Sequence, residues 1–416
     1  MKSKKKQIVF LEPFPTVMIY KIAKLFRKKG YETILIVLLE SGSSKDFHKS
    51  AFDKIFFFNL SFFKINLKNA PLILGSLFKK LRDIFKIGKS ILKLKPYAIF
   101  TRASPSWPCA IMRILFRKSP LIYFPYDIRS QYYMTSKQAI KAGMPKFEIK
   151  SEKFCFENAE GIMHKGDPEE LNFVNGRIFG NNVKLPSLQI CFHPYCSKEF
   201  IVPINKNKLS KKDKDIHMVY LGSMGTVGPT GCTYVFDNIK PLIKQKIHVH
   251  LYTRPNSISN NKVVNFFEED NNFTRTYNDI LKSKYFHLHE PLEPKEIILE
   301  ISKYDFGIWP ANTAEPPYNI EASLALGNKL SSYLEAGIPY ISNEFNKYIN
   351  KEGKEYGICS SYNEKKIGNI KDKLKKLNSK KLEKNIIKAR KDFDMDKNFP
   401  RLENFVKKVV DFKNLK

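Results

Sequence analysis

The sequence predicts an α/β protein with two domains, each built around a parallel sheet. The chain has 416 residues, enough for two domains of ordinary size. In both halves, short apolar stretches of strand length alternate with longer stretches of helical period. A polar segment with six lysines, residues 197–215, interrupts this alternation once. Because strands separated by helices form right-handed βαβ units, each half should form its own parallel sheet.

The first half begins with a strand and a helix that have clear boundaries. Residues 7–11 are uniformly apolar apart from Gln7, which predicts a buried strand. Thr16 can cap a helix over residues 17–28, and Gly30 ends it. Further elements are expected in chain order: strands at 33–39, 53–60, 97–101 and 120–125, a helix at 150–158, and a strand at 161–164.

The second half restarts the alternation after the polar segment. The expected elements are strands at 217–221, 248–253, 285–289 and 305–309, with helices at 234–244 and 294–302. Residues 402–412 form a last helix with apolar side chains on one face. The predicted division is residues 1–200 for the first domain, 214–390 for the second, and 391–416 for the C-terminal helix.

The composition is that of a folded, strongly basic protein. Hydrophobic residues make up 43% and aromatic residues 13%, which excludes a disordered chain. Lys and Arg outnumber Asp and Glu by 72 to 41, giving a net charge of +31. This excess fits nucleic acid, an anionic membrane surface or anionic substrates as partners. It also fits a general lysine-rich background, because the lysines are spread along the whole chain.

The cysteines and the N-terminus indicate a cytoplasmic protein. None of the six cysteines forms a C-x-x-C pair, and the apolar run at residues 8–11 is too short for a signal peptide. Reduced thiols are therefore expected. The run from Cys191 to Cys196 lacks a second pair of ligands, so structural cysteines are favoured and no metal is expected. No segment is long enough to span a bilayer.

The segment from Asn328 to Ile341 is the most informative in the chain. It predicts a short helix from Lys329, ended by Gly337 and followed by Pro339 and a strand. It resembles the helix-Gly-x-Pro-strand element in the nucleotide-sugar-binding domain of GT-B glycosyltransferases, whose usual wording is K-L-x-E-Y-L-A-x-G-x-P-V-I. The matching positions are Lys329, Leu330, Tyr333, Leu334, Gly337, Pro339 and Ile341.

Residues 157–163, 217–225, and 287–296 followed by 301–310 resemble further GT-B segments in family order and spacing. The resemblance implies two Rossmann-like domains whose parallel sheets face across a cleft, with a C-terminal helix returning to the first domain. It implies metal-independent transfer of a sugar from a nucleotide diphosphate sugar to a glycan or lipid-linked acceptor, as in cell-envelope polysaccharide or glycoconjugate synthesis. The same fold also carries nucleotide-sugar epimerases and could carry a non-catalytic protein.

The glycine-rich turn after residues 217–221 is the expected phosphate-binding element. Its glycines let backbone N–H groups approach a phosphate, although such a turn can also be a plain connection. Ser223 stands where the family often has arginine, so Arg254 and Lys329 become the candidate diphosphate cations unless both are solvated surface charges. The resemblance assigns donor binding to Gly222, Ser223, Gly225, Thr226, Arg254, His289, Asn328, Lys329 and Ser332.

Two acidic positions of the retaining GT-B branch are absent. Leu324 and Ser332 stand where that branch carries glutamates eight residues apart, and the second of these normally holds the donor ribose. Glu321 and Glu335 lie nearby on other helical faces. Retention and inversion of configuration both stay open.

The first domain offers a candidate general base. Asp127 follows the strand expected at 120–125, and the carboxyl ends of parallel strands bind ligands in such sheets. A carboxylate there can take a proton from an acceptor hydroxyl, as an inverting transfer requires. Alternatively, Asp127 caps the next turn and pairs with Arg129. Glu12 and His164 follow other strands at comparable positions.

Residues 72–95 form a basic amphipathic stretch. Its apolar face and opposing lysines could lie on an anionic leaflet beside a lipid-linked acceptor, making the protein peripheral on the inner face of the membrane. Such a helix can equally cover a sheet and leave its lysines in water. A nucleic-acid-binding protein is a further alternative, supported by charge alone and by no recognisable motif.

Overall fold

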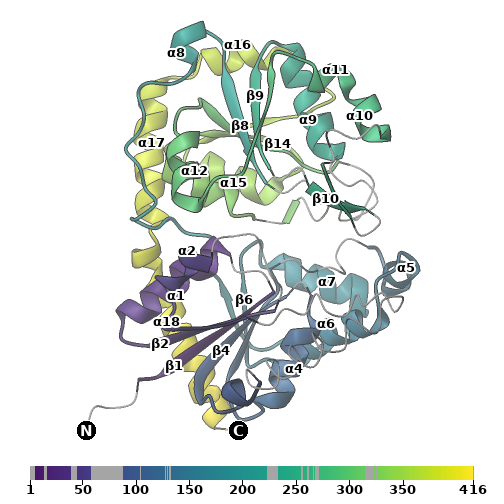
Figure 1. Cartoon of the computed structure of the whole chain (residues 1–416), viewed down its shortest axis with the longest axis vertical. Helices are drawn as coiled ribbons and strands as arrows, with labels where there is room; N and C mark the ends of the chain where they lie inside the picture. Colours follow the sequence, from purple (N-terminus) through teal and green to yellow (C-terminus); the bar gives the residue numbers. More distant parts are fainter. Residues whose placement is uncertain are drawn as a thin grey trace, which may run out of the picture. The chain divides into compact units, whose positions relative to one another are not determined.

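The computed structural model describes most of the chain as two compact units. The described residues are 5–13, 16–38, 45–57, 88–103, 105–126, 128, 130, 133–222, 233–253, 256–259, 262–265, 267, 271–313, 320, 323–324 and 326–415. One unit comprises Met1–His164, Leu171–Phe192 and Asn398–Lys416, and the other comprises Lys165–Glu170 and His193–Lys397. Each contains one parallel sheet with helices packed around it (Figure 1).

The first unit contains a seven-stranded sheet in the order β3-β2-β1-β4-β5-β6-β7. Every neighbouring pair is parallel, as predicted. Its strands are β1 (Gln7–Glu12), β2 (Glu32–Val37), β3 (Lys54–Phe57), β4 (Pro96–Arg102), β5 (Leu121–Phe124), β6 (Gly161–His164) and β7 (Leu188–Cys191). The sequence did not predict β7, because this edge strand is short and mixes polar with apolar residues.

The helices of the first unit follow the alternation expected of βαβ units. They are α1 (Val17–Lys28), α2 (Lys45–Lys49), α4 (Trp107–Leu115), α5 (Ser136–Lys141), α6 (Lys146–Asn158) and α7 (Glu169–Phe179). The predicted cap of α1 is confirmed, since the Thr16 hydroxyl accepts a hydrogen bond from the Ile19 N–H at 3.3 Å. The sequence prediction missed α4, α5 and α7.

The last helix, α18 (Met395–Asn414), packs on the first unit from Asn398 onward. The ring of Phe399 lies edge-on to that of Phe26, with centroids 4.8 Å apart. Near the other end, the Lys413 ammonium pairs with the Glu160 carboxylate at 2.8 Å. The C-terminal helix therefore returns to the first sheet, although it begins later than the predicted boundary at residue 391.

The second unit contains a six-stranded parallel sheet in the order β12-β9-β8-β13-β14-β15. Its strands are β8 (His217–Leu221), β9 (His248–Tyr252), β12 (Phe286–His289), β13 (Phe306–Trp309), β14 (Tyr340–Asn343) and β15 (Cys359–Tyr362). A separate antiparallel hairpin joins β10 (Asn256–Ser259) and β11 (Lys262–Asn265). The hairpin was not predicted, because its strands are short and rich in Asn and Ser.

Helices cover both faces of the second sheet, with α9 on one side and α12 and α15 on the other in Figure 1. They are α8 (Ser210–Asp213), α9 (Thr233–Lys244), α10 (Asn272–Thr276), α11 (Asn278–Leu281), α12 (Pro294–Ile301), α14 (Lys329–Ala336), α15 (Lys347–Glu355), α16 (Ile370–Lys375) and α17 (Ser379–Asp392). Within the described part of the chain, no helix combines the length and apolarity needed to cross a bilayer.

The predicted helix-Gly-x-Pro-strand segment is confirmed. Helix α14 ends at Gly337, whose φ of 73° lies in the left-handed region that glycine tolerates best. The Arg390 guanidinium of α17 donates hydrogen bonds to the carbonyl oxygens of Leu334 at 2.6 Å and of Glu335 and Val202 at 2.9 Å. Arg390 thereby adds a charged donor at the end of α14, where Leu334 also accepts from the Gly337 N–H and Glu335 from the Val202 N–H.

Candidate functional site

The second sheet has its topological switch point at β8. This strand begins the unit's sheet, and its neighbours β9 and β13 lie on opposite sides of it. Ligands of open α/β sheets bind outside the carboxyl ends of the strands at such a point. The residues at the ends of β8 and β13, together with the start of α14, are therefore the candidate ligand-binding site.

Lys329 projects to this switch point. Its ammonium lies 5.0 Å from the ring centroid of Tyr220 in β8 and 5.3 Å from that of Trp309 in β13. Both rings are buried, and Lys329 itself is half-buried. A cation held over two aromatic faces is stabilised by their quadrupoles and loses orientational freedom. Lys329 is also the first residue of α14, where N–H groups and the helix dipole favour an anion.

Asn328 and Ser332 lie beside Lys329 but differ in what they offer a ligand. The Asn328 side-chain oxygen is buried and accepts no hydrogen bond among the described residues. The Ser332 hydroxyl donates to the Asn328 carbonyl oxygen at 3.4 Å, within its own helix. Asn328 therefore keeps an acceptor available at the start of α14, whereas Ser332 directs its proton back to the backbone.

Gly222 directly follows β8, in a position that excludes a side chain. A Cβ atom on Gly222 would lie 2.5 Å from the Tyr220 hydroxyl oxygen, so a larger residue would displace one of the rings beside Lys329. The rest of the predicted glycine turn, namely Ser223, Gly225 and Thr226, lies outside the described residues, as does Arg254. The roles of these residues in donor binding stay predictions.

His289 lies away from the other predicted donor residues. It ends β12, an outer strand separated from β8 by β9, which places it about 10 Å from the switch point. Its Nε2 is 2.9 Å from His250 Nδ1, and its ring stacks on Tyr252 with centroids 4.5 Å apart. Burial lowers the pKa of His289. The structure thus ties His289 into a row of aromatic side chains on the sheet and does not bring it to Lys329.

A buried amide network fixes the chain that follows β13. The Asn343 side-chain amide donates to Asn238 Oδ1 at 2.9 Å and to Glu364 Oε2 at 2.6 Å. Asn238 in turn donates to the Ala311 carbonyl oxygen at 2.9 Å, and the Thr313 hydroxyl donates to Glu364 at 2.7 Å. The sequence analysis missed these residues. For Asn343, Thr313 and Glu364 the signal was a polar residue at or just after the end of a short strand, whereas Asn238 lies inside α9 and gave no such signal.

Glu335, considered in place of an absent glutamate, has a structural role. Its carboxylate accepts a hydrogen bond from the Ser197 N–H at 2.8 Å, and its carbonyl oxygen accepts one from Val202. The side chain is buried, with 1% of its surface exposed. Glu335 therefore fixes the polar segment after residue 197 rather than facing the switch point. Glu321 lies outside the described residues.

The first sheet has its own switch point at β1, between β2 and β4. Glu12 and Arg102 end β1 and β4 and form a buried ion pair there. Burial raises the pKa of Glu12 to about 7, against the lowering effect of the Arg102 guanidinium. His164 ends β6 and is also buried. Asp127 and Arg129 lie outside the described residues, so neither the predicted base nor its alternative pairing is tested.

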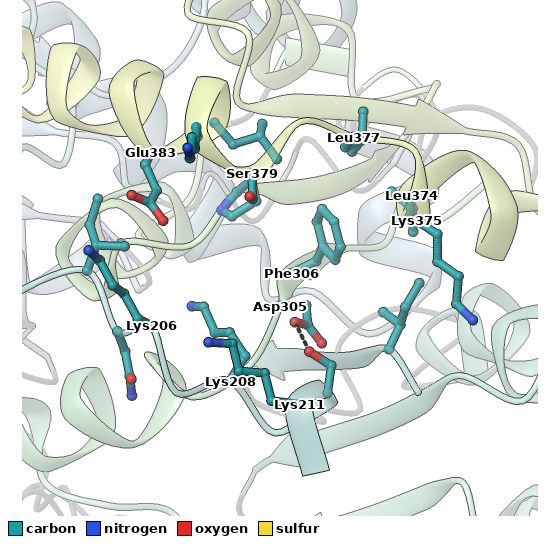
Figure 2. Close-up of a pocket in the computed structure, with 18 of the residues that line it drawn as sticks. Lys206, Lys208, Lys211, Asp305, Phe306, Leu374, Lys375, Leu377, Ser379 and Glu383 are labelled. Carbon is teal, nitrogen blue, oxygen red and sulfur yellow. Dashed lines mark hydrogen bonds between the residues drawn. The ribbon is translucent and has the colours of Figure 1, made fainter. Parts of the chain in front are cut away.

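A cavity of about 520 Å³ lies at the opposite edge of the second sheet, near the amino ends of its strands. Its lining includes Ile216, Asp305 and Pro339, which directly precede β8, β13 and β14. Figure 2 shows Lys208 and Lys211 around Asp305 in this cavity. Six lysines line it: Lys206, Lys208, Lys211, Lys214, Lys375 and Lys380. Because ligands of these sheets bind at the carboxyl ends, the cavity is not the predicted donor site.

Solved structures of similar architecture cover nearly the whole chain. Sucrose-phosphate synthase from Thermosynechococcus elongatus has a TM-score of 0.63 at 10% identity, covering 97% of this chain and 99% of that one. Anabaena HepE, solved in complex with UDP and glucose, has a TM-score of 0.61 at 12% identity, covering 97% and 100%. No protein-family profile and no curated protein sequence matches the chain. The fold is GT-B, as the resemblance implied.

Proposed function

We propose that the protein is a glycosyltransferase that moves a sugar from a nucleotide diphosphate sugar to a glycan or lipid-linked acceptor. The observation that carries this proposal is the ammonium of Lys329 over Tyr220 and Trp309 at the switch point of the second sheet. A GT-B fold alone does not define an activity. The charge and geometry at this point fit an anionic, planar ligand such as a nucleotide.

In the proposed reaction, Lys329 and the first N–H groups of α14 bind the diphosphate. The bond between the sugar and the diphosphate breaks as the acceptor oxygen bonds to the sugar, and the nucleoside diphosphate leaves with increased negative charge. A fixed cation stabilises that charge most in the transition state, which is where stabilisation accelerates transfer. The two rings fix the ammonium in advance, so little reorganisation is needed. Transfer through these groups requires no metal ion.

The acceptor hydroxyl must lose a proton as it reacts. Asp127 remains the proposed general base, since it follows β5 in the sequence and ligands of such sheets bind at the carboxyl edge, beyond the strand ends. Among the described residues, Glu12 is a second candidate at the same edge, and its pKa of about 7 suits proton transfer near neutral pH. Its ion pair with Arg102 argues against it, because the guanidinium already occupies one carboxylate oxygen.

A membrane-bound acceptor would explain the basic stretch at residues 72–95, of which 72–87 lie outside the described residues. We propose that this stretch binds anionic lipid in a protein of cell-envelope synthesis. Replacing Lys79, Lys80 and Lys86 by Glu should release the protein from anionic vesicles in a sedimentation assay and leave its melting temperature nearly unchanged. Equal sedimentation of the variant would leave only a sheet-covering role for the stretch.

The decisive experiment is a thermal-shift panel of UDP-, GDP-, ADP- and CMP-linked sugars. A ligand present at one hundred times its dissociation constant should stabilise the protein by about 2.7 kcal/mol. We expect one nucleotide class to raise the melting temperature, followed by release of the nucleoside diphosphate when acceptors are added. Stabilisation without turnover would support a non-catalytic nucleotide-sugar-binding protein. Failure of every nucleotide to stabilise the chain would contradict donor binding itself.

A further inference from the structure

Three potential metal ligands meet at the amino edge of the second sheet. Asp213 is the last residue of α8, and His217 and His248 begin β8 and β9. The two histidines are register partners, and their rings stack with centroids 4.4 Å apart and planes only 4° from parallel. Asp213 Oδ2 lies 2.8 Å from His217 Nε2 and 3.9 Å from His248 Nε2. One carboxylate oxygen and two imidazole nitrogens thus converge within 4.8 Å of one another.

The far side of each imidazole is held by another histidine. His217 Nδ1 lies 3.0 Å from His250 Nε2, and His248 Nδ1 lies 2.8 Å from His287 Nε2. If each Nδ1–H donates to its partner, the Nε2 lone pairs of His217 and His248 are both directed toward Asp213. Metal-binding histidines are typically oriented this way, with the second ring nitrogen held by a hydrogen bond.

His248 Nε2 has surroundings that suit a cation. It lies 3.9 Å from an oxygen of Asp213 and 3.9 Å from an oxygen of Asp215, beyond hydrogen-bond distance from both. Asp215 is itself fixed by the Lys371 ammonium at 2.7 Å. Ligands of a tetrahedral zinc ion, bonded at about 2.0–2.2 Å, lie roughly 3.3–3.5 Å apart. The distance from Asp213 to His217 is shorter than this value, at 2.8 Å, and the distances from His248 to Asp213 and Asp215 are longer, at 3.9 Å. Small side-chain rotations would therefore bring the ligands to the spacing that zinc requires.

We propose that Asp213, His217 and His248 bind Zn²⁺ or a similar divalent transition metal, with Asp215 as a fourth ligand. Imidazole and carboxylate together favour such ions over Mg²⁺ and Ca²⁺, which prefer oxygen ligands alone. The site lies at the opposite edge of the sheet from Lys329. The metal would have a structural role, because it would link Asp213 and Asp215, which precede β8, to the first residues of β8 and β9. This role is independent of the proposed sugar transfer.

The test uses the full chain stripped of metal by a chelator. Calorimetric titration with Zn²⁺ should give one bound ion per chain and a raised melting temperature. Asp213→Asn and His248→Gln should each weaken binding at least tenfold. Asp213 is exposed and His248 is half-buried, so the variants should fold. Asp279→Asn and His193→Gln, which change the same residue types outside the cluster, should bind like wild type.

A Co²⁺ absorption spectrum of the wild-type chain tests the ligand set without any substitution. Nitrogen and oxygen ligands should give tetrahedral d–d bands with no thiolate-to-metal charge-transfer band. A charge-transfer band would assign the ion to the cysteines and overturn the proposal. An absence of Zn²⁺ binding, or wild-type affinity in both cluster variants, would also overturn it. None of these outcomes bears on the nucleotide-sugar panel, because the two sites share no residue.

Discussion

The two edges of the second sheet hold opposite kinds of chemistry. At the carboxyl edge, Lys329 lies over two aromatic rings beside the start of α14, an arrangement that suits an anion. At the amino edge, imidazoles and carboxylates converge, an arrangement that suits a cation. The chain as a whole carries +31, and that total predicts neither arrangement. The position of a charge relative to strand direction is thus more informative about ligands than the net charge.

The largest expected effect tests whether Arg390 stabilises the carboxyl end of α14, at the edge of the sheet opposite Lys329. Arg390→Ala should lower the free energy of unfolding by about 3 kcal/mol, because three partly buried carbonyl oxygens lose a charged donor. Chemical denaturation measures this loss. Lys391→Ala changes an exposed cation on the same helix and should cost little. Equal stability of the two variants would show that water replaces the guanidinium at no cost.

The cavity at the amino edge predicts a pH effect. Burial lowers the pKa of Lys208 to about 8, and its ammonium donates to the Ser302 carbonyl oxygen at 2.8 Å. Between pH 8 and the unfolded pKa of about 10.4, the lysine is protonated in the unfolded chain but largely neutral in the folded one. The free energy of unfolding is therefore highest above about pH 10.4 and falls as the pH is lowered toward 8. After a discount for partial exposure of Lys208, the free energy of unfolding of the wild type should rise by about 1–2 kcal/mol between pH 8 and 10, relative to that of Lys208→Met. Parallel unfolding curves for the two proteins across this range would rule out the shift.

At the carboxyl edge, Lys329→Ala tests the anion site. The variant should fold normally and lose at least about tenfold in donor affinity or turnover, on the order of 1.4 kcal/mol. Lys347→Ala is the matched control, since Lys347 is an exposed lysine at the start of the neighbouring helix α15. Steady-state kinetics with the donor identified by thermal shift would distinguish the two. Wild-type behaviour of Lys329→Ala would place the diphosphate elsewhere.

The smallest expected effect on donor affinity distinguishes Ser332 in α14 from Asn328, which directly precedes the helix. Ser332→Ala should change donor affinity by less than about twofold, because its hydroxyl already bonds to the Asn328 carbonyl oxygen. Asn328→Ala should cost more, since it removes a buried acceptor that has no partner among the described residues. Titration calorimetry with the same donor compares them. A larger loss for Ser332→Ala would mean that its hydroxyl turns toward the ligand.

The sequence predicted features that depend on neighbours along the chain. The end of α14 at Gly337 could be predicted, because helix termination by a left-handed glycine is a local property. The contact of Lys329 with Tyr220 and Trp309 could not, because it joins residues from three separate elements. The amide network around Asn343 was missed for the same reason, whereas β7 was missed because it is short and mixes polar with apolar residues.

The spacing of the histidines in β9 and β12 was visible in the sequence, but it was not sufficient to predict that His217 and His248 lie together. His248 and His250 alternate along β9, and His287 and His289 do so along β12, a spacing that places each pair on one face. The sequence therefore indicated that the two histidines of each strand lie on the same face of the sheet. It did not contain the register that sets His217 beside His248, since long-range packing determines that register. The expectation of no metal rested on the Cys191–Cys196 run and on the GT-B resemblance, and it did not consider these histidines.

The return of α18 to the first unit has a consequence for protein synthesis. Phe26 and Glu160 emerge from the ribosome early, but their partners Phe399 and Lys413 belong to the last stretch of the chain. Domains generally fold in the order in which they are synthesised. Here the domain that is begun first can be completed only after the whole second domain has been made, so its unpaired surface must stay free of aggregation during that time.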